Sequence, residues 1–430
     1  MYEGKLILAP MVRAGTLAFR LLALDYGADL VYAEEIIDHR ILQCQRTINE
    51  RTKTVDFGTE KDDPVFQTLP ERERGKIIFQ IGTSDADRAL EAAKIVEDDV
   101  AAIDVNMGCP KSFSVQGGMG AALLSQPSKV ESILKKLVEN LSIPVTCKIR
   151  LLPTLDESLD LCRLIERCGV SAIAIHGRMR QERPQHPNRN CQIAAIAEAL
   201  HIPVIANGGS GEMETLEDIW KFRRQTKSSS VMVGRAALKN VSVFRPSGKD
   251  SMEDVIQKYL RYCVTYDACV ANVKYVLQRM LGEMQQTTER GQQTLHACSL
   301  QEICSIWQMD HCYARRALKR SVSTTDDGVE TMKVFIPNKR LRRSQRTPKN
   351  VFNDWCTKNK FEPPKYKTAK EGADGRFNTV VTFEGRRFGS SHLQINKKIS
   401  EQAAAFVALE CLKLTHLLPG NWNDLFVLSS

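Results

Sequence analysis

Short apolar runs alternate with amphipathic stretches over the first 245 residues, and this alternation limits the fold more than any other feature. The runs are nearly continuous, as expected for parallel strands that helices cover. Several amphipathic stretches begin with Ser, Thr or Asp, as capped helices do. Eight such units in about 240 residues predict an α/β fold, a (β/α)8 TIM barrel, rather than an open doubly wound sheet. The expected strands are Leu6–Met11, Leu30–Glu35, Lys76–Gly82, Ala102–Gly108, Pro144–Arg150, Ala172–Arg178, Pro203–Gly209 and Ser230–Ala236.

The remainder of the chain divides by composition. After a barrel over 1–245, apolar residues at three- and four-residue spacing predict a small helical domain over 250–320. Ser, Thr and Asp mark the start of a linker with a basic extension over 321–346. A helix, three strands and a second helix are expected over 347–415, which is an α+β unit, and 416–430 is expected to be a tail.

The positive charge of the chain is concentrated near its end. The net charge is +9, yet residues 1–330 hold 42 Lys and Arg against 43 Asp and Glu, whereas residues 331–430 hold 18 against 8. Phosphate backbones or an acidic surface are the partners that such an excess favours, with a merely solvated face as the alternative. The basic residues before the α+β unit include Lys339, Arg340, Arg342 and Arg343.

Polar residues stand where six consecutive predicted strands end, which is where TIM barrels carry their functional groups. The last two ends read Asn207-Gly208-Gly209 and Gly234-Arg235. Loops after the seventh and eighth strands often bind phosphate through backbone N–H groups, and arginine adds a cationic partner. A phosphorylated ligand is therefore expected, with glycines that serve only as turns as the alternative. The earlier ends carry Gln80, Gly82, Asn106, Gly108, Cys109, Lys148, Arg150, His176 and Arg178.

Cys109 lies in the segment Asn-Met-Gly-Cys-Pro, and the glycine-rich stretch Gln116–Gly120 follows it. A thiol with a pKa near 8.5 keeps its proton at neutral pH and can release it to a carbanion. Cys109 is thus a candidate acid or, as a thiolate, a candidate nucleophile. By itself, a cysteine at such a position is more often a packing residue.

The other cysteines and the apolar runs exclude several classes of protein. Thirteen cysteines occur without a CxxC pair, which suits buried thiols in a reducing compartment. The spacings among His296, Cys298, Cys304, His311 and Cys312 fit no usual ligand pattern, so no metal site is expected. With no apolar run near the ~20 residues of a membrane span and no signal peptide, we expect a cytoplasmic protein, with the nucleus as the alternative.

The chain resembles the tRNA-dihydrouridine synthase family through a series of motifs in the family's order. These motifs are LILAPMVRAGTLAFR, FQIG, DVNMGCP, CKIR, AIHGR, PVIANGG and VMVGRAA. The resemblance implies an FMN-dependent oxidoreductase that NADPH or NADH reduces. Hydride would pass from flavin N5 to C6 of a uracil ring in tRNA, and Cys109 would donate a proton to C5.

The resemblance also implies roles for the strand-end residues. Asn106 and Arg178 would face the uracil. FMN would be bound by Pro10, Met11, Val12, Gln80, Lys148, His176, Asn207, Gly208, Gly209, Gly234 and Arg235.

The α+β unit resembles a double-stranded RNA-binding domain, on the order of its elements and on the segment Asn396–Ala405. Lys397 and Lys398 would meet phosphates of A-form RNA, and the basic residues from Lys339 to Arg343 would add contacts. This combination of domains implies the eukaryotic subgroup that modifies position 20 in the tRNA D-loop. The protein is expected to be a monomer whose RNA-binding domain can also engage protein partners.

Two other functions fit part of the sequence. An FMN barrel that reduces a small dihydropyrimidine or enone would account for the barrel but not for the basic C-terminal unit. An RNA-binding regulator with a non-catalytic barrel would account for the basic unit, but it would be free to lose Cys109 and the flavin contacts, which this chain retains.

Overall fold

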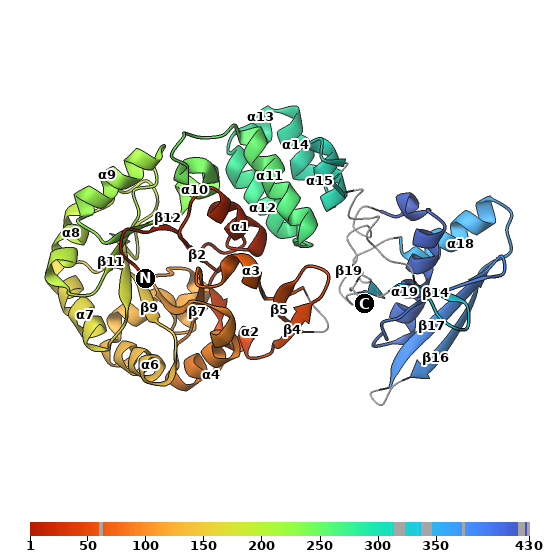
Figure 1. The fold of residues 1–430 in the computed structure, drawn as a ribbon, viewed down its shortest axis with the longest axis horizontal. Helices are drawn as coiled ribbons and strands as arrows, with labels where there is room; N and C mark the ends of the chain where they lie inside the picture. Colours follow the sequence, from red (N-terminus) through yellow and green to blue (C-terminus); the bar gives the residue numbers. More distant parts are fainter. Residues whose placement is uncertain are drawn as a thin grey trace. The chain divides into compact units, whose positions relative to one another are not determined.

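Eight parallel strands close on themselves in the first half of the chain (Figure 1). They are β1 (Leu6–Leu8), β2 (Leu30–Tyr32), β7 (Ile77–Gly82), β8 (Ala102–Met107), β9 (Val145–Leu151), β10 (Ala172–Met179), β11 (Val204–Asn207) and β12 (Ser230–Val233). Each strand pairs with its neighbours in the order β2-β1-β12-β11-β10-β9-β8-β7, and the pairing of β2 with β7 joins the two edges. The TIM-barrel prediction is confirmed: the sheet is closed, and every expected run overlaps one of these strands.

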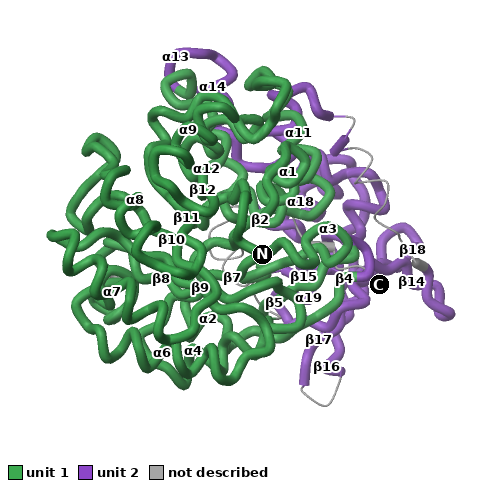
Figure 2. The backbone as a smooth tube through the Cα atoms, turned by 60° about the vertical axis from the view of Figure 1, so that its left-hand side comes forward, with its two compact units in different colours: residues 1–49, 53–59, 63–285 green, residues 50–52, 60–62, 286–430 purple. Residues whose placement is uncertain are grey.

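The computed structural model describes residues 1–59, 63–310, 312–313, 323–332, 334–336, 346–371, 375–419 and 426–427. The chain forms two compact units, which Figure 2 shows in green and purple. The first comprises residues 1–49, 53–59 and 63–285, and the second consists mainly of residues 286–430. No helix in the described part of the chain is long and apolar enough to cross a membrane.

Helices surround the barrel, as Figure 1 shows, and three of them start with a capping side chain, of which Asp85 also starts a predicted helical stretch. The Asp85 side chain accepts the Arg88 N–H at the start of one helix. Thr154 forms a capping box at the start of a second helix, and Thr215 forms one at the start of a third. The barrel helices are α1 (Leu17–Asp25), α4 (Ala86–Val96), α6 (Pro127–Asn140), α7 (Leu155–Arg167), α8 (Asn190–Ala199), α9 (Leu216–Thr226) and α10 (Arg235–Lys239).

Other short elements complete the strand–helix units. The 3₁₀ turns are η1 (Glu97–Asp99), η2 (Gly120–Ser125) and η3 (Val241–Phe244), and the helix before η2 is α5 (Ser112–Gln116). An insertion that the sequence did not reveal separates β2 from β7. It holds β3 (Ile36–Ile37), α2 (Asp38–Ile41), β4 (Gln45–Asn49), β5 (Thr54–Gly58), β6 (Phe66–Thr68) and α3 (Pro70–Glu73).

A buried ion pair fixes this insertion to the barrel. The Arg20 guanidinium on α1 donates from Nε and Nη2 to the Glu73 carboxylate at 2.7 and 3.0 Å. Its remaining donors reach the carbonyls of Gly15 and Gln67. The two side chains are 2% and 0% exposed, so the charges are compensated by each other and by backbone groups.

Two longer helices, α11 (Met252–Thr265) and α12 (Val270–Leu281), belong to the first compact unit. The ring of Tyr259 on α11 packs edge-on against Phe19 on α1, at 6.0 Å between centroids. The division between units thus falls inside the segment 250–320 that we expected to be a separate helical domain. The helices that follow are α13 (Met284–Thr287), α14 (Glu289–His296) and α15 (Leu300–Ile306).

The C-terminal unit has the predicted helix–strand–strand–strand–helix order. Its elements are α18 (Pro348–Lys358), β16 (Lys365–Glu371), β17 (Arg376–Phe383), β18 (Arg386–Ser390) and α19 (Lys397–Cys411), followed by η4 (Thr415–Leu417). Phe352, Phe388 and Phe406 are fully buried in the core between the helices and the sheet.

The sheet of this unit also takes in residues that we expected to be linker. Besides β13 (Ser323–Thr324), the strand β14 (Val329–Met332) pairs in parallel with β18, and β15 (Val334–Phe335) pairs with β19 (Phe426–Val427). Met332, Val334 and Ile336 are buried in the core. These apolar residues cover a span too short to stand out in a basic, Ser- and Thr-rich segment, so the sequence indicated a linker.

Removing one member of the buried ion pair is expected to destabilise the barrel. Glu73→Ala leaves the Arg20 charge buried without its partner, and the free energy of unfolding should fall by about 3–5 kcal/mol. Glu217→Ala breaks the exposed pair with Arg224 and should change it by about 0.5 kcal/mol or less. Urea denaturation checks both values, and equal effects of the two substitutions would contradict the assignment.

Candidate active site

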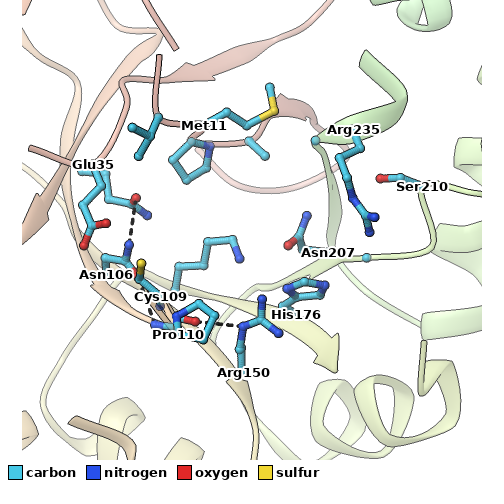
Figure 3. Close-up of a pocket in the computed structure, with 18 residues that line it drawn as sticks. Met11, Glu35, Asn106, Cys109, Pro110, Arg150, His176, Asn207, Ser210 and Arg235 are labelled. Atoms are coloured by element: carbon cyan, nitrogen blue, oxygen red, sulfur yellow. Dashed lines mark hydrogen bonds between the residues drawn. The ribbon is translucent and has the colours of Figure 1, made fainter. Parts of the chain in front are cut away.

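A cleft of about 230 Å³ opens where the barrel strands end (Figure 3). All eight strands or the residues just after them contribute to the lining. The lining consists of Ala9, Pro10, Met11, Val12, Glu35, Gln80, Asn106, Gly108, Cys109, Pro110, Lys148, Arg150, His176, Asn207, Gly208, Ser210, Gly234 and Arg235.

The strand pleat carries polar side chains into the barrel below this cleft. Gln80 and Asp104 are register partners on β7 and β8, and Asp104 is paired in turn with Thr146 on β9. Asp104 is fully buried and accepts Gln80 Nε2 at 2.8 Å and Thr146 Oγ1 at 2.7 Å. Burial raises the pKa of Asp104 to about 6, although these two hydrogen bonds oppose the shift. The bond to Asp104 fixes which way the Gln80 amide faces.

Asn106 holds the loop that carries Cys109. Its Oδ1 accepts the backbone N–H groups of Gly108 and Cys109 at 2.9 and 3.1 Å. Its Nδ2 lies 3.4 Å from Gln80 Oε1. Both ends of the Asn106 amide are therefore engaged within the protein, and the expected contact with uracil stays a prediction.

Two further features shape the same loop. Arg150 Nε donates to the Gly108 carbonyl at 2.8 Å, and its Nη1 donates to the Met179 carbonyl at 3.0 Å. Gly120 has φ +55°, and a Cβ at this position would lie 2.7 Å from the Cys109 carbonyl oxygen. Glycine is therefore required at position 120, where the backbone passes close to Cys109.

Cys109 is half-buried in the cleft wall and is set up as a protonated thiol. Burial raises the pKa of the Cys109 thiol above its ordinary value, and the charge of Glu35 raises it further. The structure therefore favours the acid role over the thiolate role that the residues alone left open.

Cationic groups gather at the base of the cleft. Burial and the nearby charge of Arg150 lower the pKa of Lys148 to about 8. Burial and the charges of Lys148 and Arg150 keep the pKa of His176 far below its ordinary value, so this imidazole is neutral. Arg178 Nη1 lies 3.3 Å from His176 Nε2, which can accept the bond only in the neutral form.

The rim opposite Cys109 is built from the ends of β11 and β12, and Figure 3 shows Asn207, Ser210 and Arg235 on that side. Gly208 has φ +117°, and a Cβ there would lie 1.9 Å from Asn188 Oδ1, so only glycine fits. Among the described residues, no acceptor takes the N–H groups of Gly208, Ser210 or Gly234. Free N–H groups beside Arg235 form a site for a phosphate group.

Two predicted site residues lie apart from the cleft lining. Gly209 faces α9, because a Cβ there would lie 2.9 Å from the Phe222 ring. The Arg178 guanidinium donates to the carbonyls of His186 and Pro184 at 2.8 and 3.3 Å. It therefore holds the loop after β10 and orients His176, and its expected contact with uracil remains a prediction.

The cleft also contains six residues that our sequence prediction of the site omitted: Ala9, Glu35, Gly108, Pro110, Arg150 and Ser210. Glu35 ends the second predicted strand, so the same strand-end criterion, applied from the first strand onward, would have found it. Arg150 was noted at a strand end but not assigned to the site. In the described part of the chain, no three His, Cys, Asp or Glu side chains are grouped to hold a metal ion, and His311 lies outside it.

The predicted RNA contacts lie in the C-terminal unit. Lys397 and Lys398 are exposed in the first turn of α19, where the Asn396 side chain caps the helix by accepting the Ile399 N–H. The structure therefore leaves both ammonium groups accessible to a phosphate backbone. Lys339, Arg340, Arg342 and Arg343 lie outside the described residues.

Comparisons with known proteins agree with this arrangement. Residues 7–338 match the family model described as dihydrouridine synthase (Dus), and residues 348–412 match the double-stranded RNA binding motif. The chain is 36% identical over 298 residues to a tRNA-dihydrouridine(20) synthase of Saccharomyces cerevisiae, a match that covers 65% of this chain and 78% of the yeast protein.

Two further similarities concern different parts of the chain. It is 37% identical over 290 residues to a tRNA-dihydrouridine(20) synthase of Schizosaccharomyces pombe, which covers 65% of this chain and 60% of that protein. A variant of the human tRNA-dihydrouridine(20) synthase RNA-binding domain is 32% identical, covers 20% of this chain and 92% of that chain, and has a TM-score of 0.19.

The match to the family model spans most of the chain and includes the whole barrel. The chain therefore belongs to the dihydrouridine synthase family, a family of redox enzymes, and carries a double-stranded RNA-binding motif after the family domain.

Proposed function

We propose that this protein is an FMN-dependent tRNA-dihydrouridine(20) synthase that uses NADPH or NADH to reduce the uracil C5=C6 bond. One observation carries the proposal: the Cys109 thiol lies across a single cleft from a rim suited to phosphate. The family membership gives the reaction, and the names of the yeast relatives support position 20 of tRNA as the site of reduction.

The residues of the cleft fit FMN. The phosphate would be held by the free N–H groups at Gly208, Ser210 and Gly234 and by the Arg235 guanidinium. Gln80, whose amide is oriented by Asp104, and Lys148 would contact the isoalloxazine ring. When bound, FMN supplies a hydride from N5 to uracil C6.

Cys109 then completes the reduction. Addition of hydride at C6 leaves negative charge on C5 and the C4 carbonyl, and the thiol proton moves to C5. A thiol is suited to this step because its pKa, raised by burial, leaves it protonated at neutral pH, while the carbanion is far more basic. The Asn106 hydrogen bonds and the turn at Gly120 fix the backbone of the Cys109 loop, and so hold the thiol in place at the cleft.

The C-terminal unit supports RNA as the carrier of the uracil. Its helix α19 starts with two exposed lysines, and residues 331–430 hold the excess positive charge of the chain. Phosphate contacts of this kind position an RNA without reading its sequence. The target nucleotide has to leave the tRNA stack to reach the cleft, as in other enzymes that act on a single base.

Replacing Cys109 is expected to separate binding from chemistry. The wild-type protein should purify with a flavin absorption spectrum that NADPH bleaches. Cys109→Ala should keep this spectrum and its bleaching but form dihydrouridine in unmodified tRNA about 10²–10⁴-fold more slowly, because the acid is lost. Cys147→Ala, at a buried position on the next strand, is the matched control. Full activity of Cys109→Ala, or a colourless folded wild type, would contradict the proposal.

The two lysines of α19 are expected to act through phosphate contacts. Lys397→Ala with Lys398→Ala should weaken tRNA binding and reduce the slope of log K against log salt by about 2, since each contact releases close to one counterion. Lys135→Ala with Lys136→Ala removes the same charge from α6 and serves as the control. Fluorescence anisotropy at several salt concentrations measures both, and equal slopes for the two double variants would rule out a specific contact.

A further inference from the structure

The cleft contains one carboxylate, Glu35, to which the reduction as described assigns no part. Figure 3 shows Glu35, Asn106 and Cys109 on the same side of the cleft. The Cys109 thiol and the Asn106 amide are the polar groups nearest to act on the carboxylate, and both lower its pKa, whereas burial raises it. Glu35 thus adjoins the reacting sulfur rather than the phosphate rim.

The backbone around Glu35 is arranged to admit this side chain. A Cβ at Gly82 would lie 2.8 Å from Glu35 Oε1 and 3.3 Å from its Cγ, so the glycine at the end of β7 leaves the space that the carboxyl group occupies. Oε1 is buried and accepts no hydrogen bond from the described residues. A carboxylate oxygen in such a position is costly. The cost indicates that the position of Glu35 serves the thiol rather than stability.

A second polar group adjoins Cys109. A Cβ at Gly120 would lie 2.4 Å from Ser114 Oγ on α5 and 3.0 Å from Cys109 Cβ, so the hydroxyl is near the thiol, and it lowers the pKa of Cys109. The other charged groups around this corner are Lys111 in the loop and Lys148 and Arg150 on β9, all of which are positive. Glu35 is therefore the negative charge that opposes a group of cations around the sulfur.

We propose that Glu35 is a positioning residue that keeps Cys109 as a protonated thiol, and so makes it an acid rather than a nucleophile. A thiolate beside an electron-poor C5=C6 bond would attack carbon, whereas a thiol next to a carboxylate retains its proton until the more basic C5 carbanion takes it. Ser114 acts in the opposite sense. Its hydroxyl stabilises the thiolate that remains after Cys109 has transferred its proton to C5. The inference deepens the proposed function, on which the acid role of Cys109 rests.

The test is the pH dependence of Cys109 alkylation by iodoacetamide, measured in the purified full-length protein by mass spectrometry of the Cys109 peptide. Only the thiolate reacts, so the midpoint of the rate profile reports the pKa of this thiol. Glu35→Gln removes the negative charge and should move the midpoint down by about one pH unit. Ser114→Ala removes the donor to the thiolate and should move it up.

Two more variants complete the design. Glu34→Gln removes the adjacent carboxylate, which accepts the Arg13 N–H at 2.7 Å, and should leave the midpoint unchanged. Glu35→Asp keeps the negative charge but moves it away from Cys109 by one methylene, so it should lower the midpoint by less than Glu35→Gln does. This variant keeps the test valid if Glu35→Gln fails to fold.

An unchanged or raised midpoint in folded Glu35→Gln, or an equal drop in Glu34→Gln, would overturn the proposal. The measurement needs neither flavin turnover nor tRNA. A failed midpoint shift is therefore distinguishable from a failure of the proposed reaction.

Discussion

The pairing of β2 with β7 closes the barrel, and the arrangement of the site depends on this closure. A closed sheet of parallel strands has no free edge, so every strand ends at the same rim. Residues distant in sequence, from Pro10 to Arg235, therefore meet around one cleft. In a closed sheet, alternate side chains of each strand point into a narrow interior. There the buried Asp104 carboxylate accepts hydrogen bonds from both Gln80 and Thr146.

The consequence is a site divided by charge and by function. Backbone N–H groups and Arg235 lie at the ends of β11 and β12, where a side chain at Gly208 or Gly209 would collide with Asn188 or Phe222. Cys109 lies across the cleft with Glu35 and Asn106. Because both halves belong to one rigid barrel, their separation is fixed by the strands and does not depend on a ligand.

Much of this could be predicted from the sequence because it follows from local periodicity. The eight strand runs, the caps at Asp85 and Thr154, and the strand-end residues all leave a mark within a few positions of each other. The hairpin insertion before β7 left no such mark, since its strands are short and partly exposed. The strands β14 and β15 were hidden in a basic segment for the same reason.

Side-chain partners across strands could not be predicted. The sequence placed Arg178 at a strand end, but only the fold shows that its donors are taken by the His186 and Pro184 carbonyls. Glu35 stands at the end of a predicted strand, but the sequence does not show that Gly82, 47 positions further on, makes room for its side chain. Such relations depend on the register of neighbouring strands, which the sequence does not encode locally.

The origin of the two added hydrogens tests the account most directly. Unmodified tRNA should be incubated with the protein and NADPH in D2O, and the product nucleoside at position 20 examined by NMR and mass spectrometry. The account predicts deuterium at C5, because the Cys109 thiol proton exchanges with solvent. Solvent deuterium absent from C5, or dihydrouridine absent from position 20, would contradict it.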